Sequence, residues 1–212
     1  MNYFGHAVVA SWTAAGDDLA GVALGAMLPD FAVMCGARVI GAGNASIERG
    51  IALHHATDAV FHHAPAVLAL FRDAGARLTA RGCRRGPTRA AAHVGIELLL
   101  DGVLVDDALH REVYAAALAV DAVSVTWRHD GDGARFAALH ARLRRHGMPD
   151  DLRRPRAAAE RIFRMLAGRR LLAPDAAERT AIAEVLDELA TPVAVAAPTI
   201  TRQVAAGLQL QR

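Results

Sequence analysis

The sequence predicts an all-α fold, a single-domain helical bundle that we expect to extend over residues 1–212. Apolar residues recur at helical spacing through long stretches rich in alanine and leucine, and few stretches alternate with a period of two. Hydrophobic residues make up 53% and charged residues 22% of the 212 positions, so the chain can bury a core without disulfide bonds.

The first half of the chain, about residues 1–120, is expected to carry the functional site. Its helices are predicted over residues 5–14, 18–28, 46–63, 65–81 and 88–119. Pro65 and Pro87 stand where the first turn of a helix tolerates proline. The segments "GAGNAS" (41–46) and "RGCRRGP" (81–87) have the composition of loops.

The second half of the chain is expected to complete the helical core. Its helices are predicted over residues 133–146, 155–168, 174–190 and 192–207, so this part of the core extends over about 133–207. The segment "HDGDG" (129–133) separates the two halves as a loop. Nothing between the halves has the composition of an interdomain linker.

The chain is predicted to be cytoplasmic, with no membrane partner. Residues 19–35 are strongly apolar, but Pro29 and the acid after it interrupt them, and a membrane span needs about 20 apolar residues. The first arginine is Arg38, so the N-terminus lacks the basic region of a signal peptide. Cys35 and Cys83 lie far apart, which favours free thiols in a reducing compartment.

The charge pattern gives no reason to expect a nucleic-acid partner. All 24 basic residues are arginine and the formal net charge is only +2, which indicates a coding bias more than a basic binding surface. One basic run is typical of a solvated helix face, and it would also suit an acidic protein partner. That run contains Arg142, Arg144, Arg145, Arg153, Arg154 and Arg156.

Polar residues follow one face of two otherwise apolar predicted helices. On a helix, positions four apart lie on the same face, so His54, Asp58 and His62 form one stripe. The segment "HVGIELLLD" repeats the pattern with a second stripe, in which the polar residues are again four apart and the residues between them are apolar. That stripe contains His93, Glu97 and Asp101.

These two stripes predict a metal site. Burying a carboxylate without a partner costs several kcal/mol, and facing the stripes across a divalent ion removes that cost. Imidazole and carboxylate donors suit manganese, iron or zinc, and helical bundles build such sites from facing helices. We expect one or two ions, with His6 and Asp30, two polar residues in apolar surroundings, completing the coordination. A hydrogen-bonded polar network without metal is the structural alternative.

Arginines just before the second stripe predict an anion contact. Arg84, Arg85 and Arg89 precede His93 closely in the sequence. Guanidinium groups bind phosphate through paired hydrogen bonds, so these side chains could hold a phosphate beside the metal.

The chain resembles the acyl carrier protein phosphodiesterase family, helical proteins distantly related to HD-domain phosphohydrolases. The opening "MNYFGHAVVA", with His6, is similar to the opening of that family, and Gly25 and the pair Asp30-Phe31 follow as they do there. The most specific block is a glycine and isoleucine, then His-x3-Asp and a later proline. Its matching residues here are Gly50, Ile51, His54, Asp58 and Pro65.

The resemblance covers about residues 1–105, and it implies an activity and a metal site. The family hydrolyses the phosphodiester that joins 4'-phosphopantetheine to a serine of acyl carrier protein, with a divalent ion that is often manganese. The resemblance therefore implies an HD-domain-like bundle, manganese as the preferred ion, and acyl carrier protein as a partner. It assigns His6, Asp30, His54 and Asp58 as metal ligands or their immediate supports.

Some positions depart from the family pattern. The family usually has aspartate where this chain has His62, and a pair of aspartates where it has His93 and Glu97. Ala26 replaces the asparagine that follows the early glycine of the family. These changes retain ligands but make the site richer in nitrogen.

The leading hypothesis is a metal-dependent phosphodiester hydrolase. Asp58 or Glu97 would orient or deprotonate the attacking water, while Arg85 and Arg89 would neutralise the charge that develops on phosphate. Two alternatives stay open at this point. One is an HD-type di-iron oxygenase, favoured by the extra histidines, and the other is a non-enzymatic helical interaction protein.

Overall fold

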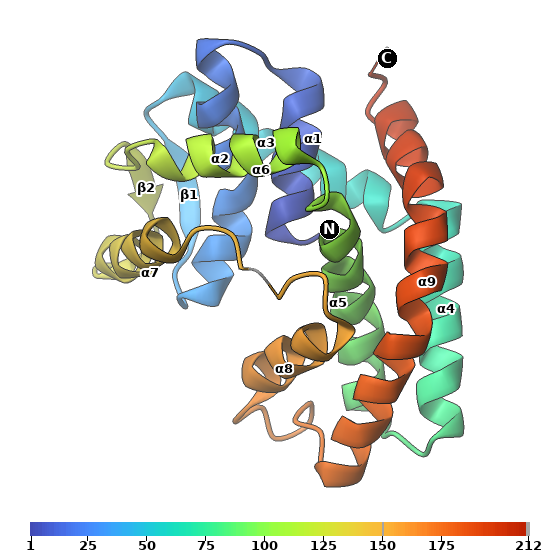
Figure 1. Cartoon of the computed structure of the whole chain (residues 1–212). Helices are drawn as coiled ribbons and strands as arrows, with labels where there is room; N and C mark the ends of the chain where they lie inside the picture. The colour runs from blue at the N-terminus through green and yellow to red at the C-terminus, as the bar shows by residue number, and fades with distance from the viewer. Residues whose placement is uncertain (150, 211–212) are drawn as a thin grey trace. The chain divides into compact units, whose positions relative to one another are not determined.

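The computed structural model describes residues 1–149 and 151–210, and in them the fold is all-α as predicted (Figure 1). The helices are α1 (Tyr3–Thr13), α2 (Asp17–Met34), α3 (Ala45–Phe61), α4 (Pro65–Ala80), α5 (Arg85–Leu104), α6 (Ala108–Ala119), α7 (Asp132–His146), α8 (Pro155–Leu166) and α9 (Ala176–Gly207). Two short strands, β1 (Val39–Ala42) and β2 (Val125–Trp127), complete the described structure.

The chain forms two compact units that are interleaved in sequence. Unit 1 contains Met1–Val60, Leu104–Pro149 and the chain from Ala205. Unit 2 contains Phe61–Val103 and the residues after Pro149 up to Val204. The expected division into a half up to about residue 120 and a half after it therefore does not describe these units, because each draws on both parts of the chain. The expectation of a single domain stays a prediction.

Unit 1 has its core where α1 packs against α2 and α6. Aromatic rings fill this junction: the Tyr3 and Phe31 ring centroids lie 5.3 Å apart, and those of Phe4 and Tyr114 lie 5.8 Å apart. These four side chains are buried. Their burial removes large apolar areas from water, so the packing fixes α1 against its neighbours.

Helices α2 and α3 approach each other closely at two glycines. A Cβ atom built on Gly25 would lie 2.1 Å from the carbonyl oxygen of Ile47, and one on Gly50 would lie 2.2 Å from that of Val22. Such distances leave no room for any side chain, so glycine is required at both positions. The crossing sets the position of the residues that follow Gly50 on α3.

Helix α2 runs six residues further than predicted. The prediction ended it at residue 28, before Pro29, but the helix continues to Met34 with the proline inside it. Leu28, Phe31 and Ala32 are all buried. Their burial compensates for the one backbone hydrogen bond that proline cannot donate.

The long helix predicted over 88–119 is two helices. The chain turns after Leu104 and begins α6 at Ala108. The carboxylate of Asp107 accepts a hydrogen bond of 2.8 Å from the backbone N–H of Leu109, which caps α6 at its start. The prediction missed this break although two acids, Asp106 and Asp107, stand at it in the sequence.

A small antiparallel sheet in unit 1 was not predicted. It pairs Val39 with Trp127, and Gly41 and Ala42 with Thr126 and Val125. Strands of three and four residues are too short to show a clear period of two. The predicted loop over 41–46 therefore contains the end of β1 and the start of α3.

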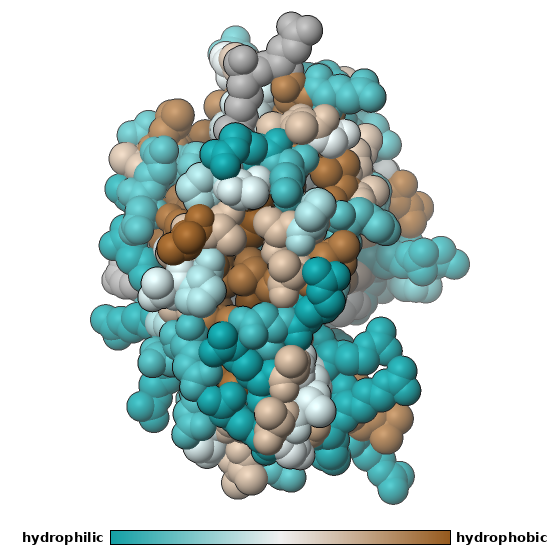
Figure 2. All heavy atoms as spheres, turned by 90° about the vertical axis from the view of Figure 1, so that its right-hand side faces the viewer, coloured by the Kyte–Doolittle hydropathy of each residue, from teal (hydrophilic) through white to brown (hydrophobic). Residues whose placement is uncertain are grey.

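In unit 2, α4 runs alongside α9 (Figure 1). Ion pairs join the two helices, with Arg77 Nη1 lying 3.1 Å from Glu188 Oε2 and Arg81 also contacting Glu188. The backbone N–H of Ala66 donates to the side chain of Gln203 at 3.1 Å. Figure 2 shows this face, where apolar residues gather between hydrophilic ones.

Helix α9 replaces the two helices predicted over 174–190 and 192–207. It continues through Pro192 and Pro198 without a break. An apolar stripe at spacings of three and four residues is buried along its length and passes both prolines. The stripe contains Ile182, Val185, Leu186, Leu189, Val193, Ala197, Ile200 and Val204.

Within the described residues, no helix combines the length and the apolar character needed to cross a bilayer.

Candidate metal centres

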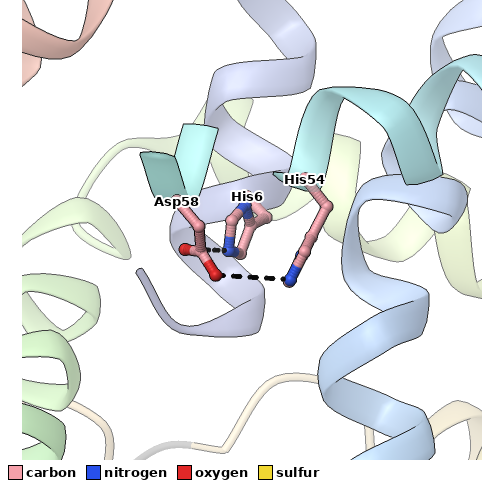
Figure 3. Close-up of side chains that lie close together, drawn as sticks. All are labelled: His6, His54 and Asp58. Carbon is pink, nitrogen blue, oxygen red and sulfur yellow. Dashed lines mark ion pairs between the residues drawn. The ribbon is translucent and has the colours of Figure 1, made fainter. Parts of the chain in front are cut away.

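The first candidate metal group lies in unit 1 and consists of His6, His54 and Asp58, the N-terminal group. One donor atom from each residue lies within 4.8 Å of the other two. Helix α1 supplies His6, and α3 supplies His54 and Asp58 one turn apart (Figure 3). The two imidazole rings stack with their centroids 3.9 Å apart.

A backbone carbonyl fixes the orientation of His54. Its Nδ1 lies 2.8 Å from the carbonyl oxygen of Ala26, which can only accept a hydrogen bond, so Nδ1 carries the proton. The Nε2 atom then carries a lone pair when the ring is neutral, and it lies 3.5 Å from Asp58 Oδ2. Burial, followed by the nearby His6, lowers the pKa of His54 to about 4. The ring is therefore neutral near pH 7, as a metal ligand must be.

Asp58 is the anionic member of the N-terminal group. Burial alone would raise its pKa, but His6 and the N-terminal amine lower the pKa well below its ordinary value. His6 Nε2 lies 3.2 Å from Asp58 Oδ1, and the amine of Met1 lies 2.7 Å from the same oxygen. Asp58 is therefore an ionised, half-buried carboxylate, and in this structure it already pairs with the cationic amine of Met1.

The second candidate metal group lies in unit 2 and consists of His62, His93 and Glu97, the cavity group. Its three donor atoms also lie within 4.8 Å of one another. His62 Nε2 lies 3.1 Å and His93 Nε2 lies 3.0 Å from Glu97 Oε1. Both histidines therefore converge on one carboxylate oxygen.

Aromatic packing holds the two histidines of the cavity group. Phe71, from α4, stacks on His93 with ring centroids 5.0 Å apart, and the rings of His62 and His93 are 4.7 Å apart. The His62 and His93 side chains are 30% and 47% exposed, whereas Glu97 is 10% exposed. The two histidine side chains are therefore partly open to solvent, while the carboxylate between them is buried.

Glu97 is ionised despite its burial. Burial would raise the pKa of its carboxyl group, but hydrogen bonds from His62 and His93 lower the pKa well below its ordinary value. A buried anion between two imidazoles is a suitable binding site for a divalent cation.

Each group fits a divalent ion by the chemistry of its donors. Two imidazoles and one carboxylate suit manganese, iron or zinc, and the donors in such sites lie about 3 to 4 Å apart. The contacts of 3.0 to 3.5 Å between nitrogen and oxygen fall in that range. Three protein ligands leave coordination positions open for water or substrate.

The predicted stripe of His54, Asp58 and His62 is divided between the two groups. Helix α3 ends at Phe61, so His62 lies in the following turn and leaves the helical register. It meets His93 and Glu97 of the second predicted stripe instead. Sequence spacing could not show this because the predicted helix extended to residue 63.

Two predicted ligands lie outside both groups. Neither Asp30 nor Asp101 joins either set of donors within the described residues. Asp30 lies on α2 and is partly buried, while Asp101 is fully buried one turn after Glu97 on α5. The N-terminal group contains His6, as predicted, without Asp30.

The three arginines before His93 have different surroundings. Arg84 is held by Glu178, with Nη2 lying 2.6 Å from Oε2, and it also donates to the carbonyl oxygen of Ala173. Arg85 and Arg89 instead line a surface cavity of about 730 Å³ together with His93. The predicted phosphate contact is therefore available to Arg85 and Arg89 but not to Arg84.

Sequence reasoning missed Arg169, which lines the same cavity after the end of α8. It is separated from His93 by 76 positions, and no spacing connects the two residues. It also missed Phe71, whose helical spacing is that of an ordinary core residue. Only the folded arrangement of unit 2 brings these residues to the cavity group.

No protein-family model, curated protein or solved structure shows significant similarity to the chain. The resemblance to acyl carrier protein phosphodiesterases stays a prediction made from the residues quoted above. Function is inferred from the two metal groups and from the side chains around them.

Proposed function

We propose that this protein is a metal-dependent phosphoester hydrolase. The observation that carries the proposal is the cavity group, in which two histidines and a glutamate converge beside Arg85 and Arg89. A metal-binding donor set beside guanidinium groups that form no ion pair within residues 1–149 and 151–210 suits a substrate with a phosphate. The N-terminal group provides a second set of the same donors.

The metal is proposed to be manganese, with iron or zinc as alternatives. The donors are nitrogen and oxygen, which all three ions accept, and the resemblance to acyl carrier protein phosphodiesterases favours manganese. His62, His93 and Glu97 would hold one ion, and His6, His54 and Asp58 another. A bound divalent ion polarises phosphoryl oxygens and lowers the pKa of a coordinated water to near neutral.

The residues of the chain have separate roles in this proposal. Arg85 and Arg89 bind the phosphate oxygens and neutralise the charge that develops on them. Glu97 fixes His62 and His93 in position, and its low pKa keeps it ionised near neutral pH. A carboxylate of low pKa is a weak base, so Glu97 is suited to orienting the attacking water more than to deprotonating it. Asp58 has the corresponding role in the N-terminal group.

The substrate proposed from the resemblance is holo-acyl carrier protein or a related phosphodiester. Acyl carrier protein would be an acidic partner, and exposed arginines provide complementary charge. Arg142, Arg144 and Arg145 are exposed on α7 in unit 1. Arg153, Arg154 and Arg156, the rest of the predicted basic run, are exposed in unit 2.

The first experiment measures metal content of the purified, tag-free protein by elemental mass spectrometry. We expect wild-type protein to retain manganese, iron or zinc, and His54→Ala and His93→Ala to lose metal. His140→Ala is the matched control, because His140 is also buried, on α7, but belongs to neither group. An absence of metal from wild type after reconstitution would overturn the proposal.

Activity distinguishes hydrolysis from oxygen chemistry. Manganese-loaded protein is expected to hydrolyse bis(p-nitrophenyl) phosphate and to release phosphopantetheine from holo-acyl carrier protein. Two imidazoles in each group also suit iron, so a di-iron oxygenase is the second candidate. Iron with an oxygen-dependent optical spectrum, and no hydrolysis with manganese, would favour that candidate over the hydrolase.

A further inference from the structure

We infer that the cavity of unit 2 binds a phosphate monoester that carries a short apolar chain. This inference deepens the proposed function, because hydrolysis of a phosphodiester at the cavity group releases a phosphate monoester, and the cavity is assigned that product class. It rests on the proposed function for the reaction, whereas the binding follows from the cavity itself. The cavity volume, about 730 Å³, is in the range of small-molecule sites.

Three arginines make part of the cavity lining cationic. Arg85, Arg89 and Arg169 line it, and within the described residues none of their guanidinium groups forms an ion pair or hydrogen bond. The neighbouring Arg84 shows the contrast, because Glu178 neutralises it. Three uncompensated cations in one cavity favour a dianion, and a phosphate monoester has that charge near neutral pH.

The start of α5 adds to this positive potential. Arg85 is the first residue of a 20-residue helix, so the positive end of the helix dipole lies at the cavity lining. His93, two turns along, brings the cavity group to the wall of the cavity. A phosphate held by the arginines therefore lies next to the proposed metal ligands.

The cavity lining also contains apolar residues, two of which are exposed. Leu171 is 80% exposed and Met165 is 38% exposed, while Val94, Leu166 and Leu172 line the cavity beside them. A bare phosphate would leave this surface in contact with water. An alkyl chain on the phosphate would cover it, and each buried methylene would strengthen binding by about two- to fourfold.

Close backbone packing fixes the two segments that line the cavity relative to each other. A Cβ atom on Gly86 would lie 2.2 Å from the carbonyl oxygen of Leu171, so the first turn of α5 lies directly against the segment after α8. Arg84 also donates a hydrogen bond to the carbonyl oxygen of Ala173, which holds the same segment in place. The arginines of α5 and the apolar residues after α8 are thus held together before a ligand arrives, which reduces the entropy cost of binding.

The test is titration calorimetry with metal-free protein and four probes: inorganic phosphate, butyl phosphate, octyl phosphate and octanol. We expect octyl phosphate to bind in a 1:1 complex at least about tenfold more tightly than butyl phosphate. Inorganic phosphate is expected to bind more weakly than either ester. Octanol binding as tightly as octyl phosphate would overturn the inference, since the arginines would then contribute nothing.

Matched variants assign the binding to this cavity. The double variant Arg89→Gln with Arg169→Gln should weaken octyl phosphate binding at least about tenfold, whereas Arg164→Gln, an exposed arginine of α8 outside the cavity, should not. Leu171→Ser should reduce the advantage of octyl over butyl phosphate. Val195→Ser, at an equally exposed apolar position on α9, should leave that advantage unchanged.

The outcomes separate this inference from the proposed function. If octyl phosphate does not bind, but manganese-loaded protein hydrolyses a phosphodiester, the inference is wrong and the hydrolase proposal stands. If octyl phosphate binds through the arginines while the protein retains no metal, the inference stands and the hydrolase proposal is wrong.

Discussion

Gly25 and Gly50 determine where His54 lies. Their lack of side chains allows α2 and α3 to cross at backbone contact, and His54 follows Gly50 by four residues on the same face of α3. This places the His54 ring against the carbonyl oxygen of Ala26, which selects its tautomer. The crossing of α2 and α3 therefore connects Gly25 and Gly50 with His54, three of the residues on which the family resemblance rests.

Substitution of Gly50 tests this connection. Gly50→Ala is expected to lower the free energy of unfolding by about 2 to 3 kcal/mol, because the added methyl group meets backbone atoms that cannot move away. Gly75→Ala is the control, since that helical position has open space around it and should gain about 0.5 to 1 kcal/mol. Urea unfolding of both variants gives the comparison. Equal effects of the two substitutions would mean that the crossing tolerates a side chain.

Residue spacing predicted which side chains are candidate metal donors better than it predicted which of those donors lie together. Six of the eight predicted ligands lie in the two groups, because polar residues in apolar helices need partners wherever they are buried. The grouping depends on where α3 ends, and one turn of helix decides whether His62 faces Asp58 or Glu97. Helix ends are set by local capping and packing, which the apolar periodicity of the sequence does not encode.

A reciprocal cap begins α9. The carboxylate of Asp175 accepts a hydrogen bond from the backbone N–H of Glu178, and Glu178 accepts one from that of Asp175, each at 2.9 Å. This is the capping-box arrangement, in which two N–H groups of the first turn are satisfied together. Glu178 also holds Arg84 at the start of α5, so one buried carboxylate connects the ends of two helices.

The Glu178 contacts predict an acid-sensitive contribution to stability. The hydrogen bond from Arg84 is the main cause that lowers the pKa of Glu178 from 4.5 to about 2, against the effect of burial. Because the folded pKa is the lower one, the stabilisation is complete above pH 4.5 and is lost as the pH falls toward 2.

Glu178→Gln is therefore expected to reduce stability at pH 7 by about 1 to 3 kcal/mol, with the difference from wild type shrinking between pH 4.5 and pH 2. Urea midpoints measured at several pH values test this. Glu184→Gln is the control, since Glu184 is largely exposed and lies 3.7 Å from Arg81. A difference between Glu178→Gln and wild type that persisted unchanged at pH 2 would contradict the assignment.

Most helices could be predicted at the level of elements, and the misses have physical causes. The apolar stripe through α9 continues past Pro192, and its burial outweighs the local preference for a break that the prediction followed. The break before α6 has the opposite cause, because the cap by Asp107 starts a new helix where the prediction continued one helix through two acids. Strands β1 and β2 depend on pairing between distant segments, which local patterns do not show.

At the scale of the molecule, each unit carries one candidate metal group, and this predicts a stoichiometry. Manganese-loaded wild type should contain two equivalents, while His54→Ala and His93→Ala should each contain one. A free manganese concentration 100 times the dissociation constant of a site should stabilise the fold by about 2.7 kcal/mol per site. Elemental analysis and thermal unfolding measure both quantities. Loss of both equivalents in either variant would contradict separate sites.

The basic run on α7 gives a prediction about the partner. Replacing Arg142, Arg144 and Arg145 by glutamate should raise KM for holo-acyl carrier protein at least about tenfold, with the effect weakening at high salt. Hydrolysis of bis(p-nitrophenyl) phosphate should be unchanged, because that substrate needs no docking surface. Steady-state kinetics at two salt concentrations test this. An unchanged KM for the carrier protein would exclude α7 as its docking surface.

The interleaving of the two units constrains the order in which the protein can fold during synthesis. The ligands of the N-terminal group are all made within the first 58 residues, and those of the cavity group follow by residue 97. Unit 2, however, needs the chain up to Val204, and unit 1 needs segments on both sides of it. Both sets of ligands are therefore synthesised long before the last segments of their units, so the nascent chain carries the metal donors before either unit can be complete.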